Sequence, residues 1–129
     1  MDYCRENMEV KIKEKELENV AALKVAMKRL AEQYGCNAVA IQCWNALQGE
    51  LGIMPCAANS LMNEEGIPVV CETDIHGAVT AVLAEAAAMN NTPSFFADWT
   101  VRHPDNENGE LLQHCGPWPI SCAREKRCV

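Results

Sequence analysis

The sequence has few basic residues, no long apolar run and no glycine-rich phosphate motif. Across its 129 residues, 11 Lys and Arg stand against 18 Asp and Glu, which gives a formal charge of −7. A nucleic acid is therefore not expected as a partner, because the basic surface that its phosphates need is missing. No apolar stretch approaches the roughly 18 residues that cross a bilayer, and residues 1–18 lack the apolar core of a secretory signal. Neither GxGxxG nor GxxxxGK with a following Ser or Thr occurs. We expect a cytoplasmic domain without nucleic-acid or membrane partners.

Eight cysteines are present, but no two of them form a CxxC pair. They stand singly at positions 4, 36, 43, 56, 71, 115, 122 and 128. This spacing argues against a structural zinc site, whose thiolates come from paired turns. Most of these cysteines lie within or beside apolar stretches, where a thiol acts as a small hydrophobic group. Without a secretory signal, reduced thiols are expected.

The apolar pattern divides the chain into one long helix and several shorter elements. Residues 1–15 carry charges of both signs and predict a solvated lead-in, followed by a single domain over 16–123. From Glu16 to Tyr34 apolar residues recur at helical spacing, and Gly35 is a stop signal. Further helices are expected from Pro55 to about Asn63–Gly66 and over Gly77–Met89. Short apolar runs typical of strands occupy Asn37–Cys43, Ile67–Cys71, Ser94–Trp99 and Leu111–Cys115.

Apolar strands that alternate with helices predict a three-layer, Rossmann-like α/β domain with a parallel sheet. In such sheets ligands bind outside the carboxyl ends of the strands. Polar side chains follow the apolar runs at four places, namely Gln42–Trp44, Glu72–Asp74, Asp98–Trp99 and His114–Gly116. We therefore expect a functional site to be assembled from these four segments.

The segment Cys71-Glu-Thr-Asp-Ile-His-Gly77 is the most pronounced candidate. If the strand continues to Asp74, its two-residue period places Glu72 and Asp74 on one face. Two carboxylates so placed repel each other, and Mg²⁺ or Mn²⁺ would remove that cost. The alternative is structural: Asp74 or Thr73 caps a helix that begins near His76, and Glu72 is solvated.

The histidines also allow a functional and a structural interpretation. His114 ends a short apolar segment, where its imidazole could bind Mn, Fe or Zn or make an ordinary hydrogen bond. His76, at a helix start, is expected at the surface, where it could support a ligating carboxylate. His103 lies in a polar, turn-rich loop and is expected to be solvated.

Aromatic and thiol side chains complete the set of candidates. Trp44 could form a platform for the apolar face of a sugar, with Gln42 beside it, or it could fill the core. Trp99 is a second candidate platform. A cysteine nucleophile, Cys56 or Cys115, is a rival from another class of enzyme.

The same segments resemble the L-fucose/L-arabinose isomerase superfamily, especially the fucose isomerase-like proteins. The resemblance covers roughly residues 34–116. It implies an aldose–ketose isomerase in which Mn²⁺ is held by carboxylates and a histidine and grips vicinal oxygens of a monosaccharide. A proton then moves between C1 and C2 through an enediol. The matching stretches are Ala40-Ile-Gln-Cys-Trp44, Gly52-Ile-Met-Pro-Cys56, Ser60-Leu-Met-Asn63, Gly66-Ile-Pro-Val-Val-Cys-Glu-Thr-Asp74, Ala97-Asp-Trp99 and His114-Cys-Gly116.

By position, this resemblance assigns Asp74 and His114 as ligands of Mn²⁺ or another divalent metal, and Glu72 as a ligand, a base or a supporting residue. The second glutamate of the family, which binds metal and transfers the proton, corresponds to Glu50, or in another register to the position of Cys56. These isomerases are much longer and oligomerise, so we expect a fragment of a homo-oligomeric protein. The alternative is a non-catalytic sugar-binding or regulatory domain of the same fold.

Overall fold

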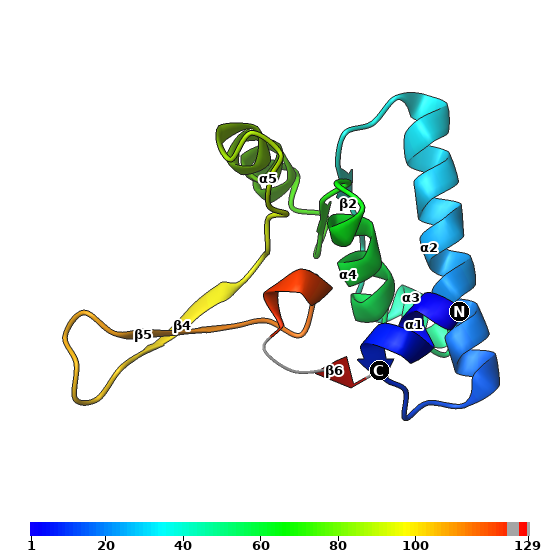
Figure 1. Ribbon diagram of the computed structural model, residues 1–129, viewed down its shortest axis with the longest axis horizontal. Helices are drawn as coiled ribbons and strands as arrows, with labels where there is room; N and C mark the ends of the chain where they lie inside the picture. Colours follow the sequence, from blue (N-terminus) through cyan, green and yellow to red (C-terminus); the bar gives the residue numbers. More distant parts are fainter. Residues whose placement is uncertain (124–126, 129) are drawn as a thin grey trace.

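The computed structural model describes residues 1–123 and 127–128 (Figure 1). Within this part of the chain, no helix is both long and apolar enough to cross a membrane. In chain order the elements are α1 (Asp2–Asn7), β1 (Met8–Glu9), α2 (Glu14–Tyr34), β2 (Val39–Ala40), α3 (Ala46–Leu51), α4 (Cys56–Glu64), β3 (Val69–Val70), α5 (Ile75–Ala87), β4 (Asp98–Arg102), β5 (Glu110–Gln113), the 3₁₀ turn η1 (Ile120–Cys122) and β6 (Arg127–Cys128).

The long helix α2 agrees with the helix predicted from its apolar spacing. At its start, the backbone N–H of Lys13 donates a hydrogen bond to Glu16 Oε2 at 2.8 Å. The acidic side chains in the first turn also stabilise the helix, because they lie near the positive end of its dipole. At its end, Gly35 adopts φ 63°, a left-handed conformation that glycine reaches without steric cost. The buried face of α2 includes Val20 and Met27, which form one hydrophobic cluster with residues of α4 and β3.

Two short parallel strands, β2 and β3, lie at the centre of the molecule. Val39 pairs with Val69, and the ladder continues past the strands, since Ile41 N donates to the carbonyl oxygen of Val70 at 2.9 Å. In Figure 1, α5 lies on one side of this pair, and α4 with α2 lies on the other. Two strands do not define a complete sheet, so the three-layer fold stays a prediction.

The strands β4 and β5 form a separate hairpin. They pair antiparallel, with an irregularity between Trp99 and Val101, and every side chain in both strands is exposed. Figure 1 shows the hairpin extending away from the helices. The expectation that the third and fourth apolar runs join the parallel sheet is therefore wrong. Their pairing depends on a partner strand, which a local apolar pattern does not specify.

The first residues form structure of their own. Within the segment expected as a solvated lead-in, helix α1 buries Cys4, and Met8 in β1 is also buried. Both belong to a second hydrophobic cluster with Leu17 of α2 and Leu61 of α4. Complete burial of a side chain such as Leu17 contributes about 1.5–3 kcal/mol, so this cluster fixes the N-terminal residues against the helices.

Candidate functional site

The turn between β3 and α5 contains the most unusual backbone of the candidate site. Glu72 and Thr73 have φ values of 62° and 58°, in the left-handed region that costs an L-residue about 1–2 kcal/mol. Hydrogen bonds hold the turn: Thr73 N donates to the Ile41 carbonyl oxygen at 3.1 Å, and Asp74 N to that of Cys71 at 3.2 Å. The strand therefore ends at Val70, and the prediction that Glu72 and Asp74 share one face of a continuing strand is wrong.

The turn places Glu72 beside Trp44, which lies after the neighbouring strand β2. Trp44 Nε1 donates a hydrogen bond to Glu72 Oε1 at 3.3 Å. Both side chains are exposed, Trp44 to 53%, so Trp44 does not fill the core. Trp44 and Glu72 therefore meet where β2 and β3 end, as expected for the carboxyl ends of parallel strands.

Asp74 is the N-cap of α5. Its Oδ1 accepts a hydrogen bond from Gly77 N at 2.9 Å, and the helix begins at Ile75. The capping alternative drawn from the sequence is thus confirmed for Asp74. Gly77 is needed here, because a β-carbon at this position would lie 2.6 Å from Asp74 Oδ2.

His114 is held in a turn just after β5. Its Nδ1 accepts a hydrogen bond from Gly116 N at 2.8 Å, and its ring and that of Phe96 pack edge to face with their centroids 5.1 Å apart. Because Nδ1 accepts, the proton of the neutral imidazole lies on Nε2. A histidine that binds a metal through Nε2 needs the opposite arrangement, in which Nδ1–H is the donor.

The described residues do not fit the divalent metal that the resemblance implies. Within residues 1–123 and 127–128, no group of three or more His, Cys, Asp or Glu side chains is arranged to hold a metal ion. Asp74 caps a helix, His114 accepts through Nδ1, and Glu50 is exposed on α3. The assignment of these three ligands stays a prediction, and these residues do not assemble a metal site by themselves.

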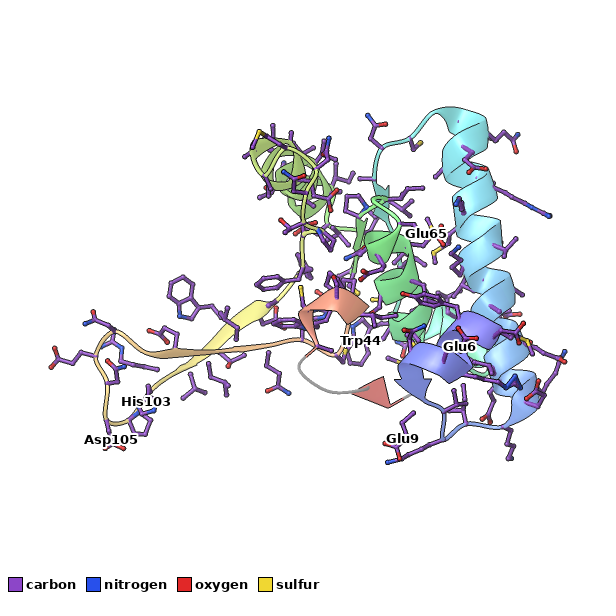
Figure 2. All side chains as sticks on the ribbon, in the orientation of Figure 1. Glu6, Glu9, Trp44, Glu65, His103 and Asp105 are labelled. Atoms are coloured by element: carbon purple, nitrogen blue, oxygen red, sulfur yellow. The ribbon has the colours of Figure 1, made fainter. Side chains whose placement is uncertain are left out.

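The remaining predicted residues lie at the surface. Gln42 is exposed at the end of β2, and Trp99 is 76% exposed in the projecting hairpin. His103 lies near the tip of that hairpin with Asp105, whose backbone N–H donates to His103 Nδ1 at 3.0 Å (Figure 2). His76 is exposed in the first turn of α5.

A pocket of about 370 Å³ opens beside the turn, between α5 and the segment that leads to β4. Asp74, His76 and Thr80 contribute its polar groups, and Phe95 and Phe96 contribute aromatic rings. Phe95 stacks on Trp118 at a centroid distance of 4.5 Å, which fixes one wall. The volume lies within the range of small-molecule sites, and a few polar groups on an otherwise apolar wall are typical of them.

The thiols of Cys56 and Cys71 are poor nucleophiles. Burial raises the pKa of Cys56 to about 12, with further contributions from the neighbouring thiol of Cys115. Burial also raises the pKa of Cys71, and Cys43 adds to the effect. Because the thiolate is the reactive form, the rival hypothesis of a thiol enzyme that uses Cys56 loses support.

The sequence reasoning missed Asn63, which connects the parts of the site. Asn63 is buried in α4, and its Oδ1 accepts from Val69 N at 2.6 Å while its Nδ2 donates to the Pro117 carbonyl oxygen at 2.8 Å. It thereby joins β3 to the segment that carries His114. A signal was available in the sequence: Asn63 lies next to apolar residues of α4, and burial of its amide without hydrogen-bond partners would cost free energy of folding.

The comparisons with known proteins identify relatives of one class. These relatives are isomerases, and each of them is named sulfoquinovose isomerase. The chain is 34% identical over 101 residues to the protein of Alkalicoccus urumqiensis, and 30% identical over 97 residues to that of Priestia aryabhattai. These matches cover 78% and 75% of this chain but only 22% and 21% of the relatives, so the chain spans about a fifth of their length. No protein-family model and no solved structure matches the chain.

Proposed function

We propose that this chain is part of an aldose–ketose isomerase of the L-fucose/L-arabinose isomerase superfamily. The proposed substrate is a monosaccharide such as sulfoquinovose, the sugar for which the relatives are named. In the proposed reaction a proton moves between C1 and C2 of the sugar through an enediol intermediate. The similarity to isomerases over three quarters of the chain supports the class of reaction.

The observation that carries the proposal is the strained turn at Glu72 and Thr73. Two consecutive residues other than glycine have positive φ, and such strain persists only where the surrounding structure imposes it. Strained backbone clusters at functional sites. Here the turn fixes the carboxylate of Glu72 beside Trp44 and aims Asp74 toward the pocket.

In this proposal Glu72 is the base that moves the proton between C1 and C2. Its carboxylate is exposed and accepts only the hydrogen bond from Trp44 among the described contacts, so it is available to a substrate. Trp44 orients that carboxylate and offers its ring to the apolar face of the sugar. Asp74 is less suited to the same role because its Oδ1 already accepts from Gly77. Proton transfer by a positioned carboxylate accelerates such a reaction by about 10²–10⁴-fold.

The dependence on Mn²⁺ or another divalent metal stays a prediction. Because the described residues assemble no three-ligand site, this prediction requires ligands from outside the described part of the chain. A second copy of the chain in a homo-oligomer is one source of such groups, and a region equivalent to the part of the relatives that this chain does not span is another.

The proposal is tested by incubating the protein with sulfoquinovose and Mn²⁺ and following the aldose and ketose signals by ¹³C NMR. We expect conversion, and Glu72→Gln should lower its rate by about 10²–10⁴-fold while the melting temperature is unchanged. Glu107→Gln is the matched control, since Glu107 is an exposed carboxylate in the hairpin loop. An unchanged rate in Glu72→Gln would remove Glu72 from the mechanism.

A non-catalytic sugar-binding domain is the second candidate. It is favoured by the lack of a three-ligand metal group among the described residues. Isothermal titration calorimetry with sulfoquinovose separates the two candidates when it is combined with the NMR assay. Binding without formation of ketose supports the second candidate, and conversion supports the first.

A further inference from the structure

A buried carboxyl group ties the chain that leaves α5 back to that helix. Glu85 is 8% exposed, whereas His76 and Thr80, the other polar side chains of α5, are exposed. Oε1 of Glu85 accepts one hydrogen bond from Ser94 N at 2.9 Å and a second from Ser94 Oγ at 2.8 Å. Burial of a carboxyl group is costly unless the group is hydrogen-bonded. The two bonds therefore stabilise Glu85 inside the fold and fix the position of Ser94.

Ser94 is held from a second side as well. Its carbonyl oxygen accepts a hydrogen bond from Asn63 Nδ2 at 3.4 Å, and Asn63 is buried in α4. The backbone N–H, the hydroxyl group and the carbonyl oxygen of Ser94 are thus all engaged, and they connect it to two helices. The chain therefore has a fixed direction where it enters residues 95–96.

The two residues after Ser94, Phe95 and Phe96, form the aromatic wall of the pocket beside the turn. The ring of Phe95 stacks on Trp118 with an interplanar angle of 14°, and the ring of Phe96 packs against His114 at 76°. Phe95 is 48% exposed, so packing stabilises its ring less than it would a fully buried one. The position of the aromatic wall therefore depends on how firmly Ser94 is held.

We infer that Glu85 is a positioning residue of this pocket: through Ser94 it holds the aromatic wall in the arrangement that receives the sugar. This inference rests on the proposed function, in which a monosaccharide binds beside Glu72 and Asp74. Glu85 does not line the pocket itself, so it acts on binding and not on proton transfer. Without its two hydrogen bonds the wall takes several arrangements, and the apparent dissociation constant rises as the competent fraction falls.

Isothermal titration calorimetry of the whole chain with sulfoquinovose and Mn²⁺ measures the effect on binding. In Glu85→Ala the dissociation constant should rise about tenfold, because the loss of both hydrogen bonds leaves the wall competent for about a tenth of the time. Glu85→Gln should bind nearly as tightly as the wild type, since its side-chain carbonyl oxygen can accept both bonds from Ser94. Glu32→Ala is the matched control, because Glu32 is an exposed carboxylate on α2, and it should leave the dissociation constant unchanged.

The fluorescence of Trp118 reports on the aromatic wall without any sugar. The chain has three tryptophans, so the double replacement Trp44→Phe and Trp99→Phe leaves Trp118 as the single emitter, and both replaced side chains are exposed. In this background Glu85→Ala should shift the emission to longer wavelength and increase its quenching by acrylamide. The reason is that a displaced Phe95 no longer covers the indole ring.

Ser94→Ala is a milder variant that decides the question if Glu85→Ala does not fold. It removes the hydroxyl hydrogen bond and keeps the backbone one, so both measurements should change in the same direction by a smaller amount. The inference is overturned if folded Glu85→Ala keeps the wild-type quenching of Trp118, or if quenching increases while the affinity for the sugar is unchanged. If the wild type binds no sugar, the proposed function fails, whereas the fluorescence still decides whether Glu85 holds the wall.

Discussion

Replacement of Asn63 by alanine should destabilise the protein more than any surface substitution. Asn63 is 2% exposed, and its amide pairs with two buried backbone groups, Val69 N–H and the Pro117 carbonyl, and at the longer distance of 3.4 Å with the Ser94 carbonyl oxygen. Val69 is completely buried. The truncation therefore leaves a buried donor and a buried acceptor without partners.

The magnitude follows from these two groups. A buried polar group that loses its partner costs about 1–3 kcal/mol, so Asn63→Ala should lower the free energy of unfolding by about 2–5 kcal/mol. Small domains have a free energy of unfolding of about 5–15 kcal/mol. The substitution therefore removes a large share of the total. Its effect should also reach the segment with His114, which the Pro117 hydrogen bond holds.

Urea unfolding followed by circular dichroism measures this change. Asn19→Ala is the matched control, because Asn19 makes a single hydrogen bond, to the Leu51 carbonyl oxygen at 2.9 Å, from a half-buried position. We expect that control to lose about 1 kcal/mol. If Asn63→Ala loses no more than Asn19→Ala, the argument that Asn63 connects the site is refuted.

Two further predictions concern the turn and the α2–α4 contact. Thr73→Gly should raise the free energy of unfolding by about 0.5–1 kcal/mol in urea titrations, because the relief of left-handed strain exceeds the entropy cost of glycine; a loss of stability would mean that the turn is not strained. Burial raises the pKa of Glu65, which is labelled in Figure 2, but hydrogen bonds from Lys24 and Lys28 outweigh this effect, so the pKa lies below its usual 4.5. A carboxylate with a lowered pKa stabilises the fold above its unfolded pKa, and this contribution disappears as the pH falls through the folded pKa. Thermal melts between pH 6 and about pH 3 should therefore decline more steeply for the wild type than for Glu65→Gln, and identical slopes would contradict the ion pairs.

The sequence predicts helices and their ends well where several local signals agree. In α2 the apolar spacing and the stop signal of Gly35 point to the same helix. Asp74 was a candidate cap because a short acidic side chain preceded an alanine-rich helix, and the structure has it in that role. Each of these features depends on neighbours within about four residues.

The turn at Glu72 and Thr73 could not be predicted in the same way. Neither residue favours positive φ, and a β-branched residue in that region is a rare exception. The conformation is imposed by a distant strand, since Thr73 N donates to the Ile41 carbonyl oxygen. Tertiary contacts therefore override the local preference that suggested a longer strand.

The hairpin escaped prediction for a related reason. The antiparallel pairing of β4 with β5 joins two segments that are separated along the sequence, and a local apolar pattern does not show which strands will pair. Only the meeting of Trp44 with Glu72 could be anticipated, because the carboxyl ends of parallel strands share one edge.

The projecting hairpin of β4 and β5 has a consequence for measurements on the whole molecule. Its side chains are all exposed, and its hydrogen bonds join its own two strands. Opening of such a unit requires no loss of the main hydrophobic clusters. Amide deuterium uptake in residues 98–113 should therefore be complete while the protons of α2 and α4 are still retained, and substitutions in the hairpin should leave that slower exchange unaltered.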